Sequence, residues 1–411
     1  MLPSKTPETG QPGTSSSATL PRLLYLGSAL PPGVSGLFPE CQPAGHLVET
    51  SLVQSVKPWF EIRSVGCSSL DLARLPQRLD DSLGLPNALN LTDKPPEIFY
   101  RWRSLVRLQR EYQRWLADGW RPGVILVCNL SPIYDGFIRW LKRRPLPPLL
   151  ALYLADSGTL GAQVSWSKRL RYRFKPLVYP ETEMVRYFDG CVAVSLSTEK
   201  FFSTRGVPWL WVPNGCEPKR ALRPEEITVE GPLRFGYVGS LGAHAGLPDL
   251  LRIFTAKERN SVLHICGFGK ARPGIAEACA KHPRLQFHDP RTPDACVQLG
   301  RGWDVLINPR PIRPGNQNNF PSKIFEYALS GRAILSSRVS GANLVLGPEA
   351  YYFDEHNFDS SLDQSLEQLA STPRQELNRR GAALQRRLLC QYSWAQQGER
   401  LAGFLKKLLA V

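Results

Sequence analysis

Short apolar runs that alternate with helical patterns extend over almost the whole of this chain. Because most of these runs are continuous and do not alternate with polar residues, they indicate strands that are covered on both faces, as in a parallel sheet. Parallel strands that alternate with helices predict doubly wound α/β domains, and 411 residues are enough for two of them. The predicted strands lie at 22–26, 124–128, 149–154, 191–195 and 210–212 in the first half, and at 233–238, 262–266, 285–288, 305–307 and 333–336 in the second.

The chain divides near residues 213–215, where Pro-Asn-Gly precedes a charged, proline-containing stretch. The first twenty residues are rich in Ser, Thr, Pro and Gly without an apolar core, so they predict a disordered tail rather than a signal peptide. No run of eighteen apolar residues occurs, so the sequence predicts a cytoplasmic protein without a membrane-spanning helix. The expected parts are a tail at 1–20, an N-terminal domain at 21–213, a linker at 214–232, a C-terminal domain at 233–390 and a final amphipathic helix at 391–411.

The stretch 319–331 has the sequence of a helix with both ends marked. Pro321 suits the first helical position, where a missing N–H group has no cost, and Gly331 suits the left-handed residue just beyond the last turn. An apolar run at 303–309 predicts a buried strand, and a polar loop joins that strand to the helix. A loop that faces the start of a helix is a typical anion-binding site.

The residues at this helix start predict the kind of ligand. The free backbone N–H groups of Ser322 and Lys323 are expected to point at a phosphate, with help from the helix dipole. Glu326 lies one turn further along, where its carboxylate can accept hydrogen bonds from a sugar hydroxyl beside that phosphate. A phosphate and a sugar hydroxyl bound side by side indicate a nucleotide-sugar site. The alternative is that Glu326 is an ordinary surface carboxylate on the helix.

Glycines follow several of the predicted strands. Ligands of doubly wound sheets bind beyond the carboxyl ends of the strands, so these loops are expected to face a cleft between the two domains. A tight strand-to-helix turn in any α/β protein also uses glycine, and the two interpretations are compatible. The glycines concerned are Gly27, Gly33, Gly36, Gly239, Gly242, Gly246, Gly267 and Gly269.

Charge and cysteine content narrow the class of protein. The net charge of +15 indicates a polyanion, an anionic membrane surface or an anionic substrate, without choosing among them. The nine cysteines include no C-x-x-C pair, so no zinc site is expected, and several lie in apolar runs, as buried thiols do in a reducing compartment. The sequence contains no recognised nucleic-acid-binding module, so nucleic acid is not an expected partner.

The C-terminal half resembles the nucleotide-sugar-dependent glycosyltransferases of the GT-B fold, in particular glycosyltransferase family four. The resemblance rests mainly on the donor signature, Phe320-Pro321-Ser322-Lys323 followed by Glu326-Tyr327, and it covers residues 180–411 more fully than 21–180. Further matching segments are Ser195 with 212–215, 235–241 with Gly246, 263–269, 303–309, 330–331 and 392–394.

The resemblance implies two Rossmann-like domains that face each other across a cleft, with the final helix crossing back to the N-terminal domain. It implies transfer of a sugar from a nucleoside diphosphate sugar, which is a substrate and not a cofactor, to an acceptor hydroxyl, usually with retention of the anomeric configuration. The acceptor is expected to be a carbohydrate or a lipid-linked molecule in polysaccharide or glycolipid synthesis. The implied donor-binding residues are Gly36, Gly239, Ser240, Gly267, Asn318, Pro321, Ser322, Lys323 and Glu326, with Glu326 on the ribose.

The sequence departs from the family at three positions. Asn318 stands where the first of the family's two glutamates contacts the donor sugar, and Ser240 and Ala245 stand where the family often has Arg and Lys beside the diphosphate. These departures leave a second hypothesis open, a catalytically impaired GT-B protein with a binding or regulatory role. The local cations that could balance the diphosphate are His244, Arg310, Arg313 and, favoured by the motif, Lys323.

Two residues are candidates for catalysis. Asp156 ends an apolar strand, and it is expected either to orient or deprotonate the acceptor hydroxyl or to cap the following helix. His244 is expected either to act on the leaving group or to be a solvated loop histidine. The chain contains no D-x-D signature, so the sequence predicts chemistry without a bound metal ion, with the helix dipole and cations stabilising the leaving diphosphate.

Basic and aromatic residues share a predicted helix at 102–115. Two interpretations fit: docking on an anionic membrane, which would place the protein at the inner face of that membrane, or an ordinary amphipathic helix that packs on the sheet. One stripe carries Trp102, Leu105, Leu108, Tyr112 and Trp115 and another carries Arg103, Arg107, Arg110 and Arg114, with further basic segments at 142–144 and 168–175.

Overall fold

The computed structural model describes residues 19–28, 43–66, 78–79, 88–90, 100–155, 181–224, 230–269, 271–289, 292–313 and 316–410. Every structural statement below concerns those residues. The predictions for Gly36, for Asp156 and for the basic segment 168–175 lie outside them, as does the predicted tail except for its last two residues.

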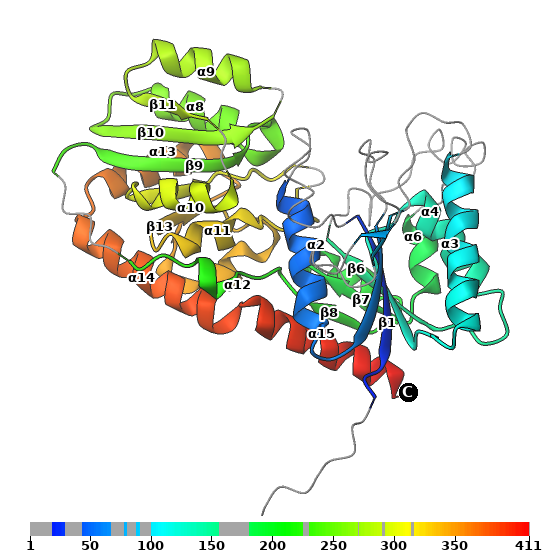
Figure 1. Ribbon diagram of the computed structural model, residues 1–411. Helices are drawn as coiled ribbons and strands as arrows, with labels where there is room; N and C mark the ends of the chain where they lie inside the picture. The colour runs from blue at the N-terminus through cyan, green and yellow to red at the C-terminus, as the bar shows by residue number, and fades with distance from the viewer. Residues whose placement is uncertain are drawn as a thin grey trace, which may run out of the picture.

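An eight-stranded sheet forms the N-terminal half (Figure 1). Its central strands are continuous apolar runs, and successive side chains enter hydrophobic clusters on opposite faces, with Tyr25 and Leu126 on one face and Leu24 and Ile125 on the other. Neighbouring strands pair in parallel except β3 and β4, which are antiparallel at one edge. The order is β3 (Arg78–Leu79), β4 (Ala88–Asn90), β2 (Glu61–Gly66), β1 (Arg22–Gly27), β5 (Val124–Cys128), β6 (Leu149–Leu154), β7 (Gly190–Ala193) and β8 (Trp209–Trp211).

A six-stranded parallel sheet forms the C-terminal half. Its first strand, β9, lies between β10 and β12, so the strand order reverses there and opens a crevice at the carboxyl ends of β9 and β12. Gly236 in β9 leaves room for an indole to lie on the sheet, since a Cβ there would lie 1.8 Å from the ring of Trp303. The order is β11 (Leu285–His288), β10 (Ser261–Phe268), β9 (Leu233–Ser240), β12 (Val305–Asn308), β13 (Ala333–Ser336) and β14 (Tyr351–Tyr352).

Helices cover both sheets (Figure 1). Among the described helices, none is long and apolar enough to cross a membrane. The N-terminal half contains α2 (Pro43–Val56), α3 (Tyr100–Ala117), α4 (Pro132–Leu141), α6 (Glu181–Met184) and α7 (Glu199–Ser203). The C-terminal half contains α8 (Leu247–Thr255), α9 (Arg272–Lys281), α10 (Pro293–Arg301), α11 (Lys323–Leu329), α12 (Ala342–Leu346), α13 (Phe358–Ala370) and α14 (Arg374–Gln391), and α15 (Trp394–Leu409) ends the chain.

Helix α3 matches the expected apolar stripe for most of its length. Leu105, Leu108, Tyr112 and Trp115 are buried, and α3 packs against α4, where Tyr112 makes edge-on ring contacts. Trp102 in the first turn differs, because its side chain is 61% exposed. The stripe therefore belongs to the core from Leu105 onward, and Trp102 is a surface residue.

The chain passes between the two halves twice, near Cys216 and near 392–394, and these two segments are hydrogen-bonded to each other. The N–H group of Cys216 donates to the carbonyl of Tyr392 at 2.9 Å, and the N–H group of Trp394 donates to the carbonyl of Cys216 at 3.0 Å. Helix α15 begins with a capping box and packs closely on α2, where a Cβ on Gly398 would lie 2.2 Å from the carbonyl oxygen of Ser55. The helices α14 and α15 thus run along one side of the molecule and join its two halves (Figure 1).

Candidate functional site

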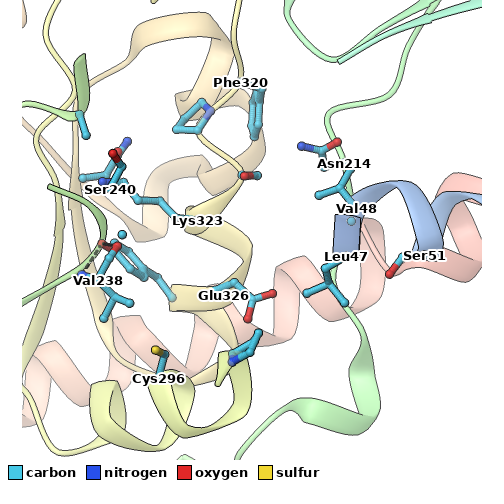
Figure 2. Close-up of a pocket in the computed structure, with 18 of the residues that line it drawn as sticks. Leu47, Val48, Ser51, Asn214, Val238, Ser240, Cys296, Phe320, Lys323 and Glu326 are labelled. Carbon is cyan, nitrogen blue, oxygen red and sulfur yellow. Dashed lines mark hydrogen bonds between the residues drawn. The ribbon is translucent and has the colours of Figure 1, made fainter. Parts of the chain in front are cut away.

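A cavity of about 390 Å³ lies between the two halves, at the carboxyl ends of β9 and β12. Leu47, Val48 and Ser51 of α2 line one wall together with Asn214 of the linker. The opposite wall includes the end of β9 and α11, as Figure 2 shows, and Asn308 at the end of β12 also lines the cavity. The cavity therefore lies at the crevice where a doubly wound sheet binds its ligand.

Helix α11 begins at Lys323, two residues later than the sequence predicts. Ser322 precedes the helix, and its N–H group donates to the carbonyl of Phe320 at 2.9 Å. The prediction that Ser322 offers a free N–H group to a phosphate is therefore wrong, because the tight turn at Pro321 already uses that donor. Pro321 and Ser322 both line the cavity, and Gly331 beyond the helix has the expected left-handed φ of 72°.

Tyr327 holds α11 against the ends of the strands. The registered pairs of β9 and β12 end at Gly236 and Leu306, and the Tyr327 hydroxyl lies where the two strands part. It accepts from the N–H group of Val238 at 3.0 Å, donates to the carbonyl of Val238 at 2.8 Å, and lies 3.3 Å from the carbonyl oxygen of Ile307. These contacts fix the helix that carries the donor signature at the mouth of the crevice.

The amine of Lys323 is buried in this crevice. Its nitrogen is inaccessible to solvent and has no hydrogen-bond partner among the described residues. It lies 4.2 Å from the centroid of the Tyr237 ring, which is a cation–π contact. Burial, with the positive charge of Arg310 adding to it, holds the pKa of the Lys323 amine well below its ordinary value. Because a buried cation without a counter-ion is costly, this arrangement fits an anionic ligand.

Gly239 and Ser240 lie at the end of β9, beside the Lys323 side chain, and both line the cavity. Gly239 has a φ of 147°, and a Cβ on it would lie 3.5 Å from Cδ of Lys323. Gly267 does not line the cavity in the part of the chain that the structure describes. A Cβ on Gly267 would lie 1.9 Å from the carbonyl oxygen of Gly239, so this glycine lets β10 approach β9.

The carboxylate of Glu326 is paired with Arg220, a residue of the linker. Nη1 and Nη2 of Arg220 donate to Oε1 and Oε2 of Glu326 at 2.9 and 2.7 Å. The Glu326 side chain is 34% exposed and lines the cavity on the same wall as Lys323 (Figure 2). Since an ionised carboxylate can accept about four hydrogen bonds, the pair with Arg220 leaves capacity for ligand hydroxyls.

Asn318 contacts the N-terminal half and is not among the described residues that line the cavity. Its Oδ1 accepts from the Ser197 hydroxyl at 2.9 Å, and the carbonyl of Gln317 lies 2.7 Å from the same hydroxyl. Ser340, with a φ of 62°, holds the loop 316–319 from the other side, because its hydroxyl lies within 2.9 Å of three carbonyl oxygens of that loop. The position where the resembling family has a carboxylate thus forms a contact between the two halves.

His244 lies in the turn η5 (Ala243–Ala245) after β9 and lines the cavity. Its ring packs over Gly242, where a Cβ would lie 2.8 Å from the imidazole. The carbonyl of His244 accepts from Nδ2 of Asn316 at 2.8 Å, which ties the turn to the loop before α11. Within the described ranges, no group of three or more His, Cys, Asp or Glu side chains is arranged to hold a metal ion.

The structure gathers most of the described candidates around one cavity, whereas Gly267 and Asn318 lie off it. Among the lining residues that the sequence patterns did not single out as site residues are Arg220 and Asn214. Asn214 has a left-handed φ of 65°, and its Oδ1 accepts from the hydroxyl of Tyr153 at 3.0 Å. The Pro-Asn-Gly turn carried a signal for Asn214, since Asn tolerates this conformation. Nothing local marked Arg220 among the other charges of the linker.

Comparison with known proteins identifies the fold. No family model and no curated protein matches the sequence. Solved structures match almost the full length, and the chain has the predicted GT-B fold.

Three of these structures show the extent of the likeness. Sucrose-phosphate synthase from Thermosynechococcus elongatus aligns with a TM-score of 0.69 and 14% identity over 95% of this chain and 99% of its own. HepE of Anabaena, in complex with UDP, aligns with a TM-score of 0.66 and 12% identity over 94% and 100%. The apo form of the lipopolysaccharide outer core galactosyltransferase WaaB aligns with a TM-score of 0.64 and 13% identity over 94% and 99%. At these identities the likeness establishes the fold.

Proposed function

We propose that the protein is a glycosyltransferase that moves a sugar from a nucleoside diphosphate sugar to an acceptor hydroxyl. The observation that carries the proposal is the buried amine of Lys323, which has no hydrogen-bond partner among the described residues and lies one helical turn from Glu326 in the same cavity. A cation and a carboxylate at this spacing suit a diphosphate beside a ribose. The HepE structure, which shares the fold, contains UDP.

The proposed transfer breaks the bond between the anomeric carbon and the phosphate oxygen, and the electron pair goes to the diphosphate. Lys323, protonated when the diphosphate binds, and His244 stabilise that charge. The acceptor oxygen forms the new bond on the same face, its proton passes to a diphosphate oxygen, and the configuration is retained. No protein nucleophile and no metal ion takes part. The donor binds the domain at 233–390, and the domain at 21–213 presents a carbohydrate or lipid-linked acceptor.

Nucleoside diphosphate sugars are expected to stabilise the protein against thermal unfolding. A ligand at a hundred times its dissociation constant raises the free energy of unfolding by about 2.7 kcal/mol, so a thermal-shift screen with UDP, ADP and GDP sugars should reveal the donor. The purified protein should then release the nucleoside diphosphate from that donor when an acceptor is supplied. Absence of a shift with every nucleotide and sugar nucleotide of the screen would contradict the proposal.

Three residues favour a second function, a GT-B protein that binds a nucleotide without transferring a sugar. Asn318 bonds to Ser197 where the resembling family has a sugar-contacting carboxylate, and Ser240 and Ala245 bring no charge to the diphosphate. Thermal stabilisation by a donor without any hydrolysis or transfer would support this second function.

We also propose that the start of α3 docks on an anionic membrane. Because α3 leads into β5, its first turn lies at the carboxyl-end edge of the sheet, and Trp102 and Arg103 are exposed there. An exposed Trp beside Arg suits the headgroup region of anionic lipid. In liposome flotation at low salt, the protein should float with anionic vesicles, and Trp102→Ala should float less. Equal recovery with neutral and anionic vesicles would remove this idea.

A further inference from the structure

Arg220 connects the linker to the cavity. It is the last residue of the short turn η4 (Pro218–Arg220), and its side chain is 18% exposed. Besides the two bonds to Glu326, its Nε donates to Oδ1 of Asp294 at 2.5 Å. Arg220 and Glu326 line the cavity, whereas Asp294 is 74% exposed at the start of α10 and is not among the lining residues that the structure describes.

The backbone that carries Arg220 is fixed relative to α11. The N–H group of Leu222 donates to the carbonyl of Leu329, the last residue of α11, at 2.9 Å. Nε2 of Gln385 lies 2.8 Å from the carbonyl oxygens of both Leu222 and Leu329. The guanidinium of Arg220 and the carboxylate of Glu326 are therefore held from backbones that are bonded to each other.

This arrangement determines how the carboxylate can meet a ligand. The planar fork of a guanidinium occupies one acceptor direction on each carboxylate oxygen and prevents the group from rotating. One further acceptor direction then remains on each oxygen of Glu326, and the two point to opposite sides of the carboxylate. A single acceptor held in a fixed direction matches one O–H donor of a ligand, such as the 2′- or the 3′-hydroxyl of a ribose.

We propose that Arg220 is a positioning residue, which fixes the carboxylate plane of Glu326 so that one of its free acceptor directions meets a ribose hydroxyl of the donor nucleotide. This inference rests on the proposed function. Asp294 holds the remaining edge of the guanidinium and keeps the fork aimed at Glu326. Without Arg220, the carboxylate is free to rotate on an exposed edge of α11 and meets the ribose hydroxyl in one of many orientations.

The test compares nucleotides with and without the ribose 2′- and 3′-hydroxyls. Isothermal calorimetry measures binding of UDP and of 2′,3′-dideoxyuridine diphosphate, or of the corresponding ADP or GDP pair if the thermal-shift screen selects that base. Because Arg220→Ala frees the Glu326 carboxylate to rotate, it should weaken binding of the ribose form about tenfold or more. Binding of the dideoxy form should stay within about twofold, since that nucleotide does not use Glu326. Arg220→Lys, which keeps the charge without the fork, should fall between.

The matched control is Arg379→Ala. Arg379 also makes a bidentate pair, with Glu376 on α14, and it is 69% exposed away from the cavity. This variant removes the same charge and a bond of the same kind, so it should leave the affinity for both nucleotides unchanged.

Two binding results would contradict the positioning role of Arg220. Equal weakening of both nucleotides by Arg220→Ala would overturn it, because the arginine would then act on the diphosphate or on the fold. Unchanged binding of the ribose form would overturn it as well, and in both cases the proposed function would stand. If the wild-type protein binds none of the three nucleotide pairs, the proposed function fails and the inference with it. Retained binding of the dideoxy form shows that the variant is folded.

Discussion

Replacing Lys323 with Met is expected to stabilise the folded protein and to remove most of its affinity for a nucleoside diphosphate. The buried amine has no hydrogen-bond partner among the described residues, and Met fills a similar volume without a polar atom. Removing such an unsatisfied group should raise the free energy of unfolding by about 1–3 kcal/mol. Losing the charge partner of the diphosphate should weaken UDP binding by about 100-fold or more. Thermal melts and calorimetry on the same preparation measure the two effects.

Lys281→Met is the matched control. Lys281 lies on α9 of the same half, its side chain is 72% exposed, and it pairs with Glu277 across one helical turn. Removing an exposed charge of this kind should change stability by less than about 1 kcal/mol and leave nucleotide affinity as it is. A Lys323→Met protein that melts below the wild type would contradict the expected gain in stability, and one that binds the nucleotide normally would place the phosphate somewhere else.

The pKa of Lys323 adds a pH dependence to the same prediction. In the unfolded chain the amine has its ordinary pKa of 10.5, whereas burial lowers the pKa in the folded protein. Between these two values the unfolded state holds a proton that the folded state lacks, so the contribution of this group to the free energy of unfolding increases as the pH rises through that window. Binding of a diphosphate favours the protonated amine. Calorimetry in buffers of different ionisation enthalpy should therefore show proton uptake, and Lys323→Met should not.

The central strands of both sheets could be predicted because short runs of apolar residues mark them in the sequence. Val124–Cys128, Leu149–Leu154 and Ala333–Ser336 have the predicted bounds, since each is a largely apolar run covered on both faces. Leu285–His288 also has the predicted bounds, although it is an edge strand that is only partly buried. Glu61–Gly66 was missed because polar residues interrupt its apolar positions, although it lies next to β1 in the sheet. The pairing of this strand with β1 depends on the whole sheet and cannot be recognised from a local sequence pattern.

The candidate site could also be predicted only in part. Ser322, Lys323 and Glu326 belong to one turn and one helix, so their spacing alone places them on one wall. Arg220 lies 106 residues before Glu326 in the chain, and Ser197 lies 121 residues before Asn318. Contacts over such separations depend on how two domains meet, and this explains why the pairing of Glu326 and the contact of Asn318 with the N-terminal half could not be read from the sequence.

Replacing Glu326 with Ala is expected to reduce the affinity for the donor nucleotide by about 100-fold, because the acceptor for a ribose hydroxyl is lost and a hydrogen bond to a charged group contributes about 1.5–3 kcal/mol. The variant also leaves the largely buried guanidinium of Arg220 with Asp294 as its remaining carboxylate partner among the described residues. Calorimetry with UDP measures the loss, and thermal melts check the fold. Glu376→Ala is the matched control, since Glu376 has a 35% exposed side chain and a bidentate bond from Arg379 on α14. Unchanged affinity in Glu326→Ala would move the ribose away from α11.

Combining Glu326→Ala with Arg220→Ala tests whether Arg220 acts through the Glu326 carboxylate. If Arg220 acts through the Glu326 carboxylate, adding Arg220→Ala to Glu326→Ala should cause no further loss of affinity, since the group that Arg220 positions is already absent. Two losses that simply add would mean that the arginine contacts the nucleotide itself. Because the two side chains are joined by bonds of 2.9 and 2.7 Å, a strong coupling is the expected result, and its size measures how much of the ribose recognition depends on a carboxylate held in one plane.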